Sequence, residues 1–432
     1  MHKTLIIILI IIIPGLSTGV SQVIFEKKIG FNEYTEFPSN IITTSGQNYL
    51  LSLYSIPVIN KNEPFSTLYL IDSTGNIINT NSIIKSDTST KIQYIRSSFT
   101  SNHYIGVGGL KHLDEIYLWI FEFDSNLNIF NEHKIQLPDA LSLSRTYIRK
   151  SQFEYYIAFE FFKSPYNSPH NMMLNYNPLD NSIITSNWEM GGSFFDFEKN
   201  NYDDGFLIAG RLLNKSATTL WEVNHEMELT NQYNDLENDI YHQNDLAWTN
   251  NNKLIHAGSY RNPDYETTRF MGIQILDSNM NAQNFKSFGE IGIWNYAGSN
   301  ESIVVNADNS IYFAGTQGIE YINYPPSNNH IAVHKMDSSL NLDWSYLIGG
   351  DAYYITRSIS TTFDGGCIIT ATRYDEALQN QEYDVYLIAM GPDGLDTSID
   401  DPENDDDVVL YPNPGNDMFT IDTKEHHFTF TL

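Results

Sequence analysis

Short apolar strings recur along the chain at nearly constant intervals. Each string is five residues long and mostly aliphatic or aromatic, and successive copies begin 48 to 57 positions apart. The seven copies begin at Tyr49, Tyr104, Tyr156, Phe206, Leu254, Ile311 and Cys367. A regular period of this size is typical of repeat architectures in which each repeat is one supersecondary unit. The chain is therefore predicted to fold as seven copies of one small unit.

Turns and further strands surround each string. Most copies follow a turn rich in Asn, Asp and Gly, which tolerate the positive φ of tight hairpins, so a strand is expected before each turn. Downstream, an alternating apolar segment closes on Asp or Asn, as at 68–72 and 272–277. A fourth segment often ends in glycine, as at 344–349. Four antiparallel strands of about five residues, with their turns, fill about 50 residues, which predicts one propeller blade per repeat.

The two ends of the repeat array are complementary. The last repeat has a third strand at 385–389 and a turn at 392–394, but no fourth strand of its own. The segment from Val23 to Gly30 has the outer-strand pattern and no blade around it. Pairing these two segments would complete the last blade and remove two exposed sheet edges. Residues 22–395 are thus predicted to form an all-β fold, a seven-bladed β-propeller of four-stranded antiparallel blades that the N-terminal strand closes.

The N-terminus has the pattern of an export signal. Lys3 precedes nine consecutive Leu and Ile residues at 5–13. At ~1.5 Å per residue this run covers about half of the ~30 Å hydrocarbon layer, which is too short for a transmembrane anchor. Small residues at 17, 19 and 21 suit cleavage after Ser21. Residues 1–21 are predicted to be a signal peptide, and the mature protein is expected to be secreted or held at the outer cell surface with no transmembrane span.

The amino-acid composition excludes several classes of partner and of site. The 432 residues carry 24 Lys and Arg against 53 Asp and Glu, a formal net charge of −29. Such an acidic surface repels phosphate backbones and anionic lipids, so neither a nucleic-acid partner nor electrostatic membrane docking is expected. Cys367 is the single cysteine, which excludes an intrachain disulfide and a multi-cysteine zinc site.

Common catalytic and cofactor motifs are missing from the sequence. It contains no phosphate-binding loop, HExxH, GxSxG or dinucleotide-binding fingerprint. The acidic stretch 400–407 lacks the central Gly and terminal Glu of a calcium loop, and the adjacent His426 and His427 would point to opposite sides of a strand. Other histidines, such as His256 and His334, are expected at the surface or in turns. We therefore expect no metal site and no cofactor.

The C-terminal segment resembles a known secretion domain. Residues 396–407 are acidic and indicate a solvated linker. The core that follows consists of Leu410, Tyr411, Pro412, Asn413 and Pro414. With the strand around Phe419, this core resembles the start of the type A C-terminal sorting domain of the type IX secretion system of Bacteroidota, and the repeats resemble propellers that precede such domains. The resemblance implies export through the periplasm and contact with the secretion machinery, with residues 408–432 as a shortened sorting domain.

The long connections between second and third strands are the candidate binding surface. The tyrosines predicted to lie on them are Tyr166, Tyr260, Tyr265, Tyr321, Tyr324 and Tyr374. Any single one of these tyrosines is expected to pack within its own loop more often than to bind a ligand. As a cluster, aromatic side chains on loops at one end of a ring suit stacking on sugars or contact with a protein. The leading hypothesis is a non-catalytic extracellular binding or adhesion propeller that recognises a glycan or a protein through these loops.

The competing hypothesis is a propeller hydrolase or lyase that acts on polysaccharide. Its general acid and base would be carboxylates gathered from different blades. The candidates are Asp114, Glu115, Asp264, Glu320 and Asp375. Two carboxylates ~5–10 Å apart at the channel mouth would favour the enzyme, whereas an aromatic shelf without them would favour binding.

Overall fold

The structure is a computed structural model that describes most of the chain. Within the repeat region it describes residues 23–30, 33–58, 63–165, 168–186, 192–202, 205–212, 218–234, 236, 238, 240–265, 268–319, 327–375 and 383–394. Near the C-terminus it describes residues 408–412, 418–423 and 427–431. By its internal contacts the chain divides into two units, residues 1–395 and 396–432.

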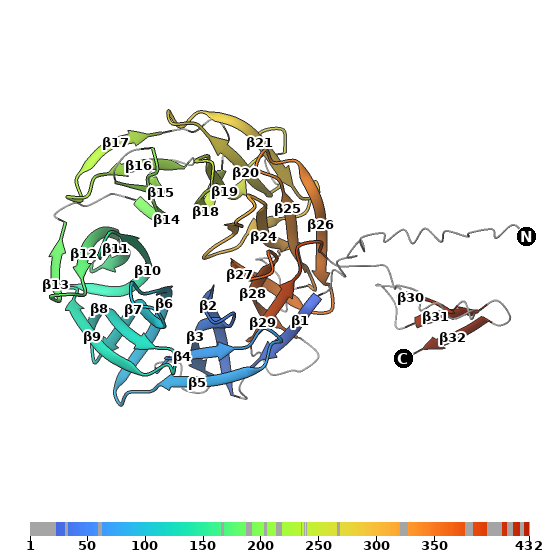
Figure 1. Cartoon of the computed structure of the whole chain (residues 1–432), viewed down its shortest axis with the longest axis horizontal. Helices are drawn as coiled ribbons and strands as arrows, with labels where there is room; N and C mark the ends of the chain where they lie inside the picture. The colour runs from blue at the N-terminus through green and yellow to red at the C-terminus, as the bar shows by residue number, and fades with distance from the viewer. Residues whose placement is uncertain are drawn as a thin grey trace, which may run out of the picture. The chain divides into compact units, whose positions relative to one another are not determined.

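The first unit is a ring of antiparallel sheets around a central axis (Figure 1). Blade 1 contains β2 (Tyr34–Thr43), β3 (Tyr49–Pro57), β4 (Phe65–Ile71) and β5 (Ile77–Ile83). Blade 2 contains β6 (Thr88–Ser97), β7 (His103–His112), β8 (Glu115–Asp124) and β9 (Ile129–Gln136). Blade 3 contains β10 (Ala140–Ser151), β11 (Glu154–Lys163), β12 (Ser168–Asn177) and β13 (Ser182–Thr185).

The remaining blades follow in chain order. Blade 4 contains β14 (Gly192–Lys199), β15 (Phe206–Leu212), β16 (Thr219–Val223) and β17 (Leu229–Tyr233). Blade 5 contains β18 (Ile240–Trp248), β19 (Leu254–Tyr260), β20 (Phe270–Leu276) and β21 (Ala282–Phe288). Blade 6 contains β22 (Asn295–Ala297), β23 (Ile303–Val305), β24 (Ile311–Gln317), β25 (His330–Met336) and β26 (Leu342–Gly349). Blade 7 contains β27 (Tyr353–Thr361), β28 (Cys367–Tyr374), β29 (Tyr383–Met390) and β1 (Val23–Ile29).

The N-terminal strand closes the ring. β1 pairs antiparallel with β29, from Val23 opposite Met390 to Ile29 opposite Val385. Phe25 and Ile29 are buried in a cluster with residues of blades 7 and 1. The predicted seven-bladed, all-β propeller with this closure is therefore confirmed for the described residues.

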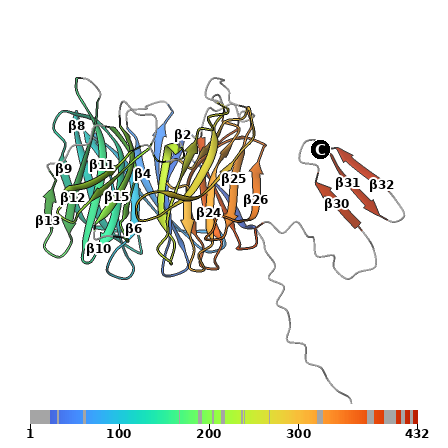
Figure 2. The ribbon, with the colours of Figure 1, turned by 90° about the horizontal axis from the view of Figure 1, so that it is seen from above.

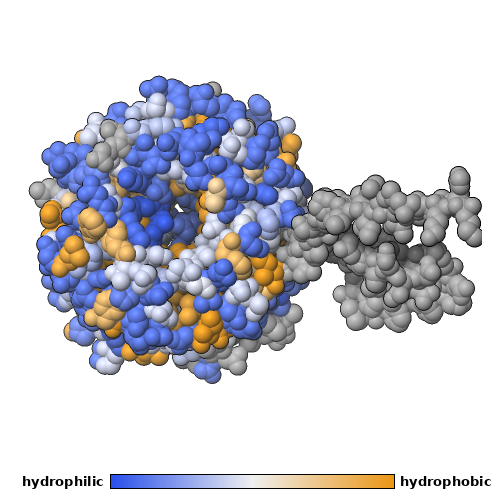
Figure 3. All heavy atoms as spheres, in the orientation of Figure 1, coloured by the Kyte–Doolittle hydropathy of each residue, from blue (hydrophilic) through white to orange (hydrophobic). Residues whose placement is uncertain are grey.

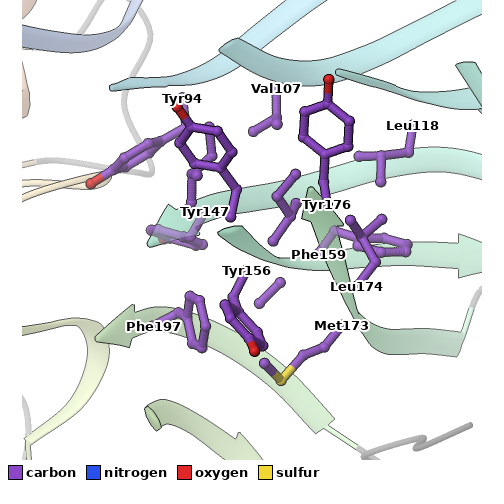
Figure 4. Packing of buried hydrophobic residues seen from close by; sticks show 14 of the residues in the cluster. Tyr94, Val107, Leu118, Tyr147, Tyr156, Phe159, Met173, Leu174, Tyr176 and Phe197 are labelled. Carbon is purple, nitrogen blue, oxygen red and sulfur yellow. The ribbon is translucent and has the colours of Figure 1, made fainter. Parts of the chain in front are cut away.

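The recurring strings are the second strands of the blades, which neighbouring blades cover on both faces. The second strand β19 is buried at every position except its last, whereas the outer strand β9 alternates between half-buried and exposed positions. A strand buried on both faces needs a continuous apolar run, and this requirement explains why the strings stand out in the sequence. Figure 4 shows one inter-blade cluster, in which Tyr94, Tyr147 and Tyr156 pack with aliphatic side chains of blades 2 to 4. Cys367 is also buried.

The inner strands, which are the first strands of the blades, are irregular. Their pairing with the second strand shifts register in β2, β6, β10, β14, β18 and β27. In blade 6 the inner strand is divided into β22 and β23. Such bulges re-aim side chains and increase local twist. They therefore decide which residues of the inner strands face the axis.

The second unit contains a three-stranded antiparallel sheet. Its strands are β30 (Val408–Pro412), β31 (Met418–Thr423) and β32 (His427–Thr431). Leu410, Tyr411 and Pro412 of the predicted sorting motif lie in β30 and pair with β31, whereas Asn413 and Pro414 lie outside the described residues. Among the described residues we find no helix with the length and apolarity needed to span a bilayer.

Candidate functional site

The inner strands surround a central channel, and Figure 3 shows the hollow at the centre of one face. Figure 2 shows the blades side on, with their turns and loops at the two ends of the ring. Near the C-terminal ends of the inner strands the channel widens into a cavity of about 670 Å³. Equivalent register positions along its wall are occupied by Ile42, Arg96, Arg149, Glu198, Ala247, Val304 and Ser360. At this register blades 2 to 4 contribute charged side chains, called here the charged wall, and the other blades contribute uncharged ones. Asp245 of blade 5 and Glu301 of blade 6 line the same cavity from other positions.

An ion-pair network stabilises the charged wall. Arg149 is buried and lies 3.2 Å from Asp196 and 2.9 Å from Glu198. Its guanidinium also donates to the Tyr94 hydroxyl at 3.1 Å, and this hydroxyl in turn donates to Glu301. Arg96 donates to the same Tyr94 oxygen at 2.9 Å. The network links blades 2, 3, 4 and 6 beside the larger cavity.

Buried carboxylates connect one blade to the next. Asp196 accepts the backbone N–H of Leu246 at 2.8 Å, and Asp245 accepts those of Ser302 and Ile303 at 2.6 and 2.8 Å. Burial raises the pKa of Asp245 well above its usual value, and the negative charges of Asp196 and Glu301 add to this effect. These carboxyl groups therefore act first as inter-blade hydrogen-bond acceptors.

A smaller cavity of about 130 Å³ lies toward the N-terminal ends of the inner strands. The second and third strands are connected at this end of the ring, because the first residue of β2 pairs with the last residue of β3. The cavity, called here the basic cavity, is lined by Lys91, Arg145 and Arg357 from blades 2, 3 and 7. No carboxylate is among the described residues that line it.

Aromatic side chains border the basic cavity. Phe37 stacks on Tyr54 with ring centroids 5.1 Å apart and on Tyr383 at 6.0 Å. These three half-buried rings are called here the aromatic shelf. The Lys91 ammonium lies 4.7 Å from the centroid of the Tyr54 ring, and the Arg357 guanidinium lies 5.6 Å from that of Phe37. Cation–π contacts of this kind hold the basic side chains against the shelf.

The predicted loop tyrosines have different surroundings. Tyr374 is buried and packs on Tyr383 of the aromatic shelf, with ring centroids 5.3 Å apart. Tyr260 lies against Phe285 of its own blade at 4.7 Å. Tyr265 is 40% exposed in the loop of blade 5. Tyr166, Tyr321 and Tyr324 lie outside the described residues.

The described members of the predicted catalytic carboxylates belong to blades 2, 5 and 7, and Glu115 and Asp375 have partners within their own blades. In blade 2, Glu115 accepts from Gln136 at 3.0 Å and follows Asp114 in the turn between β7 and β8. Asp375 forms an ion pair with Arg373 at 3.2 Å in blade 7. Asp264 lies in the loop of blade 5, where its N–H donates to Asn262 at 2.9 Å. Glu320 lies outside the described residues.

The histidines and possible metal ligands among the described residues form no further candidate site. Among the residues that the structure describes, no group of three His, Cys, Asp or Glu side chains is placed to hold a metal ion. The expectation that His256 and His334 lie at the surface or in turns is wrong, because both are buried in strands. Burial lowers the pKa of each to about 3, so both are neutral packing residues.

Comparisons with known proteins return similar solved structures but no family for this chain. No family model and no curated protein sequence matches the chain. Similar solved structures include the Dos1 propeller, which is 12% identical with a TM-score of 0.46 over 86% of this chain and 96% of that one. Hydrazine synthase of Kuenenia stuttgartiensis is 8% identical with a TM-score of 0.49 over 82% of this chain and 95% of that one. The polysaccharide lyase Uly1 is 9% identical with a TM-score of 0.49 over 82% of this chain and 90% of that one.

Proposed function

We propose that this protein is a non-catalytic binding propeller that recognises an extracellular glycan or protein at the face of the ring formed by the connections between second and third strands. The observation that carries the proposal is the aromatic shelf beside the basic cavity, which has no carboxylate among its described lining residues. Stacked rings that remain half-buried offer a stiff apolar surface at low entropic cost. Such a surface suits binding, and the pair of carboxyl groups on which most glycoside hydrolases depend is missing from its described lining.

The export signal and the sorting motif set the place where this binding would happen. We propose that the chain is cleaved after Ser21 and reaches the outside of the cell, where residues 408–432 contact the secretion machinery. N-terminal sequencing of the secreted protein tests the cleavage site, since Gln22 would then be the first residue.

A glycan-array and pull-down screen of the full chain, with Tyr54→Ala as the key variant, tests the binding face. We expect Tyr54→Ala to weaken binding of the selected ligand about three- to tenfold because it removes a ring of the shelf. Phe130→Ala is the matched control, since Phe130 is 54% exposed on the outer strand β9. Loss of binding in the control with retention in Tyr54→Ala would contradict the proposed face.

A polysaccharide hydrolase or lyase is the second candidate function, and the larger cavity favours it. Asp245, whose pKa is raised by burial, lines this cavity together with Glu198 and Glu301. A carboxyl group with a raised pKa beside other carboxyl groups is an arrangement suited to general acid–base catalysis. A polysaccharide-degradation screen separates the candidates, because product release that Asp245→Asn abolishes would establish the enzyme.

A further inference from the structure

The basic cavity concentrates positive charge inside a strongly acidic molecule. Lys91, Arg145 and Arg357 come from three blades and meet in one cavity, although the chain has only 24 Lys and Arg and a net charge of −29. Arg357 and Arg145 are close enough to lower the pKa of Lys91, which burial and their positive charges together bring to about 8. Mutually repelling cations at a half-buried site are costly unless an anion joins them.

The donors of Lys91 and Arg145 are only partly used within the protein, whereas Arg357 donates to Thr372 at 2.8 Å and to Ser299 at 3.3 Å. A guanidinium has five N–H donors, and Arg145 donates to the Phe194 carbonyl at 2.6 Å. The Lys91 ammonium contacts the Tyr54 ring. An ammonium and a guanidinium facing one cavity form the donor set that a carboxylate prefers. A cavity of about 130 Å³ holds one such group rather than a chain of residues.

Gln93 adds an acceptor to this donor set. Its amide nitrogen donates to the Ser144 carbonyl at 2.7 Å, whereas its Oε1 is buried without a partner. A buried acceptor without a donor is costly. The Gln93 Oε1 has almost no accessible surface, so a ligand hydroxyl would satisfy it after the amide turns toward the cavity. The aromatic shelf borders the same cavity and suits the apolar face of a ring. A ligand with a carboxylate, a hydroxyl and a ring with an apolar face would match these three features, and a sugar acid has all three.

We propose that the basic cavity is a subsite for the carboxylate of a uronic-acid residue, with the sugar ring on the aromatic shelf and a ring hydroxyl donating to Gln93. This proposal rests on the proposed binding function and names the class of its ligand. The net charge of the protein repels dense polyanions, which favours a ligand with isolated carboxylates over a heavily sulfated or phosphorylated chain.

An NMR titration of the full chain with methyl β-D-glucuronide and methyl β-D-glucoside tests the subsite, because the two probes differ in the carboxylate alone. The glucuronide should bind at least about tenfold more tightly, and Lys91→Gln and Arg145→Gln should each remove this preference. Lys134→Gln on β9 is the matched control, with its ammonium on the outer strand, and should leave the preference unchanged. Thermal unfolding confirms that each variant is folded.

Other outcomes separate the two proposals. Equal binding of both probes, weakened by Tyr54→Ala, would overturn the carboxylate subsite and support the binding face. Absence of binding by either probe would overturn the sugar-acid subsite, while retention of another partner by the shelf would preserve the proposed function. Tighter binding of a tetraglutamate peptide, displaced from the same cavity by the glucuronide, would overturn the sugar class.

Discussion

Lys91 is a lysine in a basic environment, and this sets its chemistry. Burial first, and then the positive charges of Arg357 and Arg145, lower the pKa of its ammonium to about 8. Around it, burial raises the pKa values of Tyr54 and Tyr94, so neither hydroxyl titrates near neutral pH. Lys91 is therefore the group of the basic cavity whose charge changes at mildly alkaline pH.

Ligand binding should consequently weaken as the pH rises through about 8. The ammonium is charged below this value and neutral above it, so the contribution of Lys91 to the attraction of a carboxylate is present at pH 7 and lost by pH 9.5, whereas Arg145 and Arg357 stay charged. We expect glucuronide affinity to fall about tenfold over this interval. Lys91→Arg keeps the charge at both pH values and should abolish the pH dependence. An unchanged pH profile in Lys91→Arg would show that another group titrates.

The other charged and titratable groups at this site are Arg145, Arg357, Tyr147 and Glu301, which accepts from Tyr94.

Asp245 allows a second test at the residue scale. Asparagine can still accept the N–H groups of Ser302 and Ile303 and carries no negative charge near Asp196 and Glu301. The free energy of unfolding of Asp245→Asn should therefore lie within about 1 kcal/mol of that of the unmodified chain at pH 7. Asp245→Ala should lose about 2 to 4 kcal/mol, because two buried N–H groups lose their acceptor. Urea denaturation measures both. Equal damage in the two variants would show that the ionised carboxylate is required.

At the scale of elements, the turns between third and outer strands share one design. Asp72, Asp124, Asp277 and Asp337 each accept the N–H groups two and four residues on at 2.7 to 2.9 Å. The residue three positions on has a positive φ, and in blades 2, 5 and 6 it is a buried Leu or Met. Blade 1 has Gly75 there instead, because Phe25 of the closing strand β1 occupies the space.

Gly75→Ala should therefore destabilise the fold by more than the backbone strain of a positive φ alone would. Its φ is +87°, and an added Cβ would lie 2.6 Å from Cδ2 of Phe25. Gly292 is the matched control, since its φ is +84° with no atom within 4 Å of an added Cβ. We expect about 1 kcal/mol of destabilisation for Gly292→Ala and about 2 to 4 kcal/mol for Gly75→Ala, measured by thermal unfolding. Equal losses would contradict the contact with Phe25.

At the scale of the whole molecule, one strand holds the ring closed. β1 pairs with β29 along its length and buries Phe25 and Ile29 between blades 7 and 1. Without it, β29 would present an open edge to solvent, which promotes association between molecules. The closing strand therefore contributes to both stability and solubility.

Removal of residues 1–32 tests the closure against a chain that lacks residues 1–21 only. The shorter chain should lose about 3 to 6 kcal/mol from the two buried side chains and should aggregate. A synthetic peptide of residues 22–31 added in trans should raise the melting temperature again, since it can occupy the edge of β29. Equal melting temperatures for the two chains would contradict the role of β1.

Most of the architecture could be read from the sequence because its signals are local. A second strand buried on both faces needs a continuous apolar string, so the seven blades and the unpaired outer strand at 23–29 are visible without coordinates. The predicted string of blade 3 begins at Tyr156, which is one residue too late. The residue equivalent to Tyr49 is Tyr155, because both pair with the end of the third strand of their blade. A slip of one residue exchanges the two faces of a strand, so sequence alone could not assign channel-facing residues reliably.

The sequence by itself determined the number of blades, their strand order and the closing partner, since each depends on the order of polar and apolar residues within about 50 positions. Only the tertiary structure decided which side chains share a cavity. Lys91, Arg145 and Arg357 are separated by more than fifty residues from one another and meet because the ring brings blades 2, 3 and 7 to one axis. The bulges of the inner strands then set the direction of each side chain, and this depends on contacts between blades rather than on local pattern.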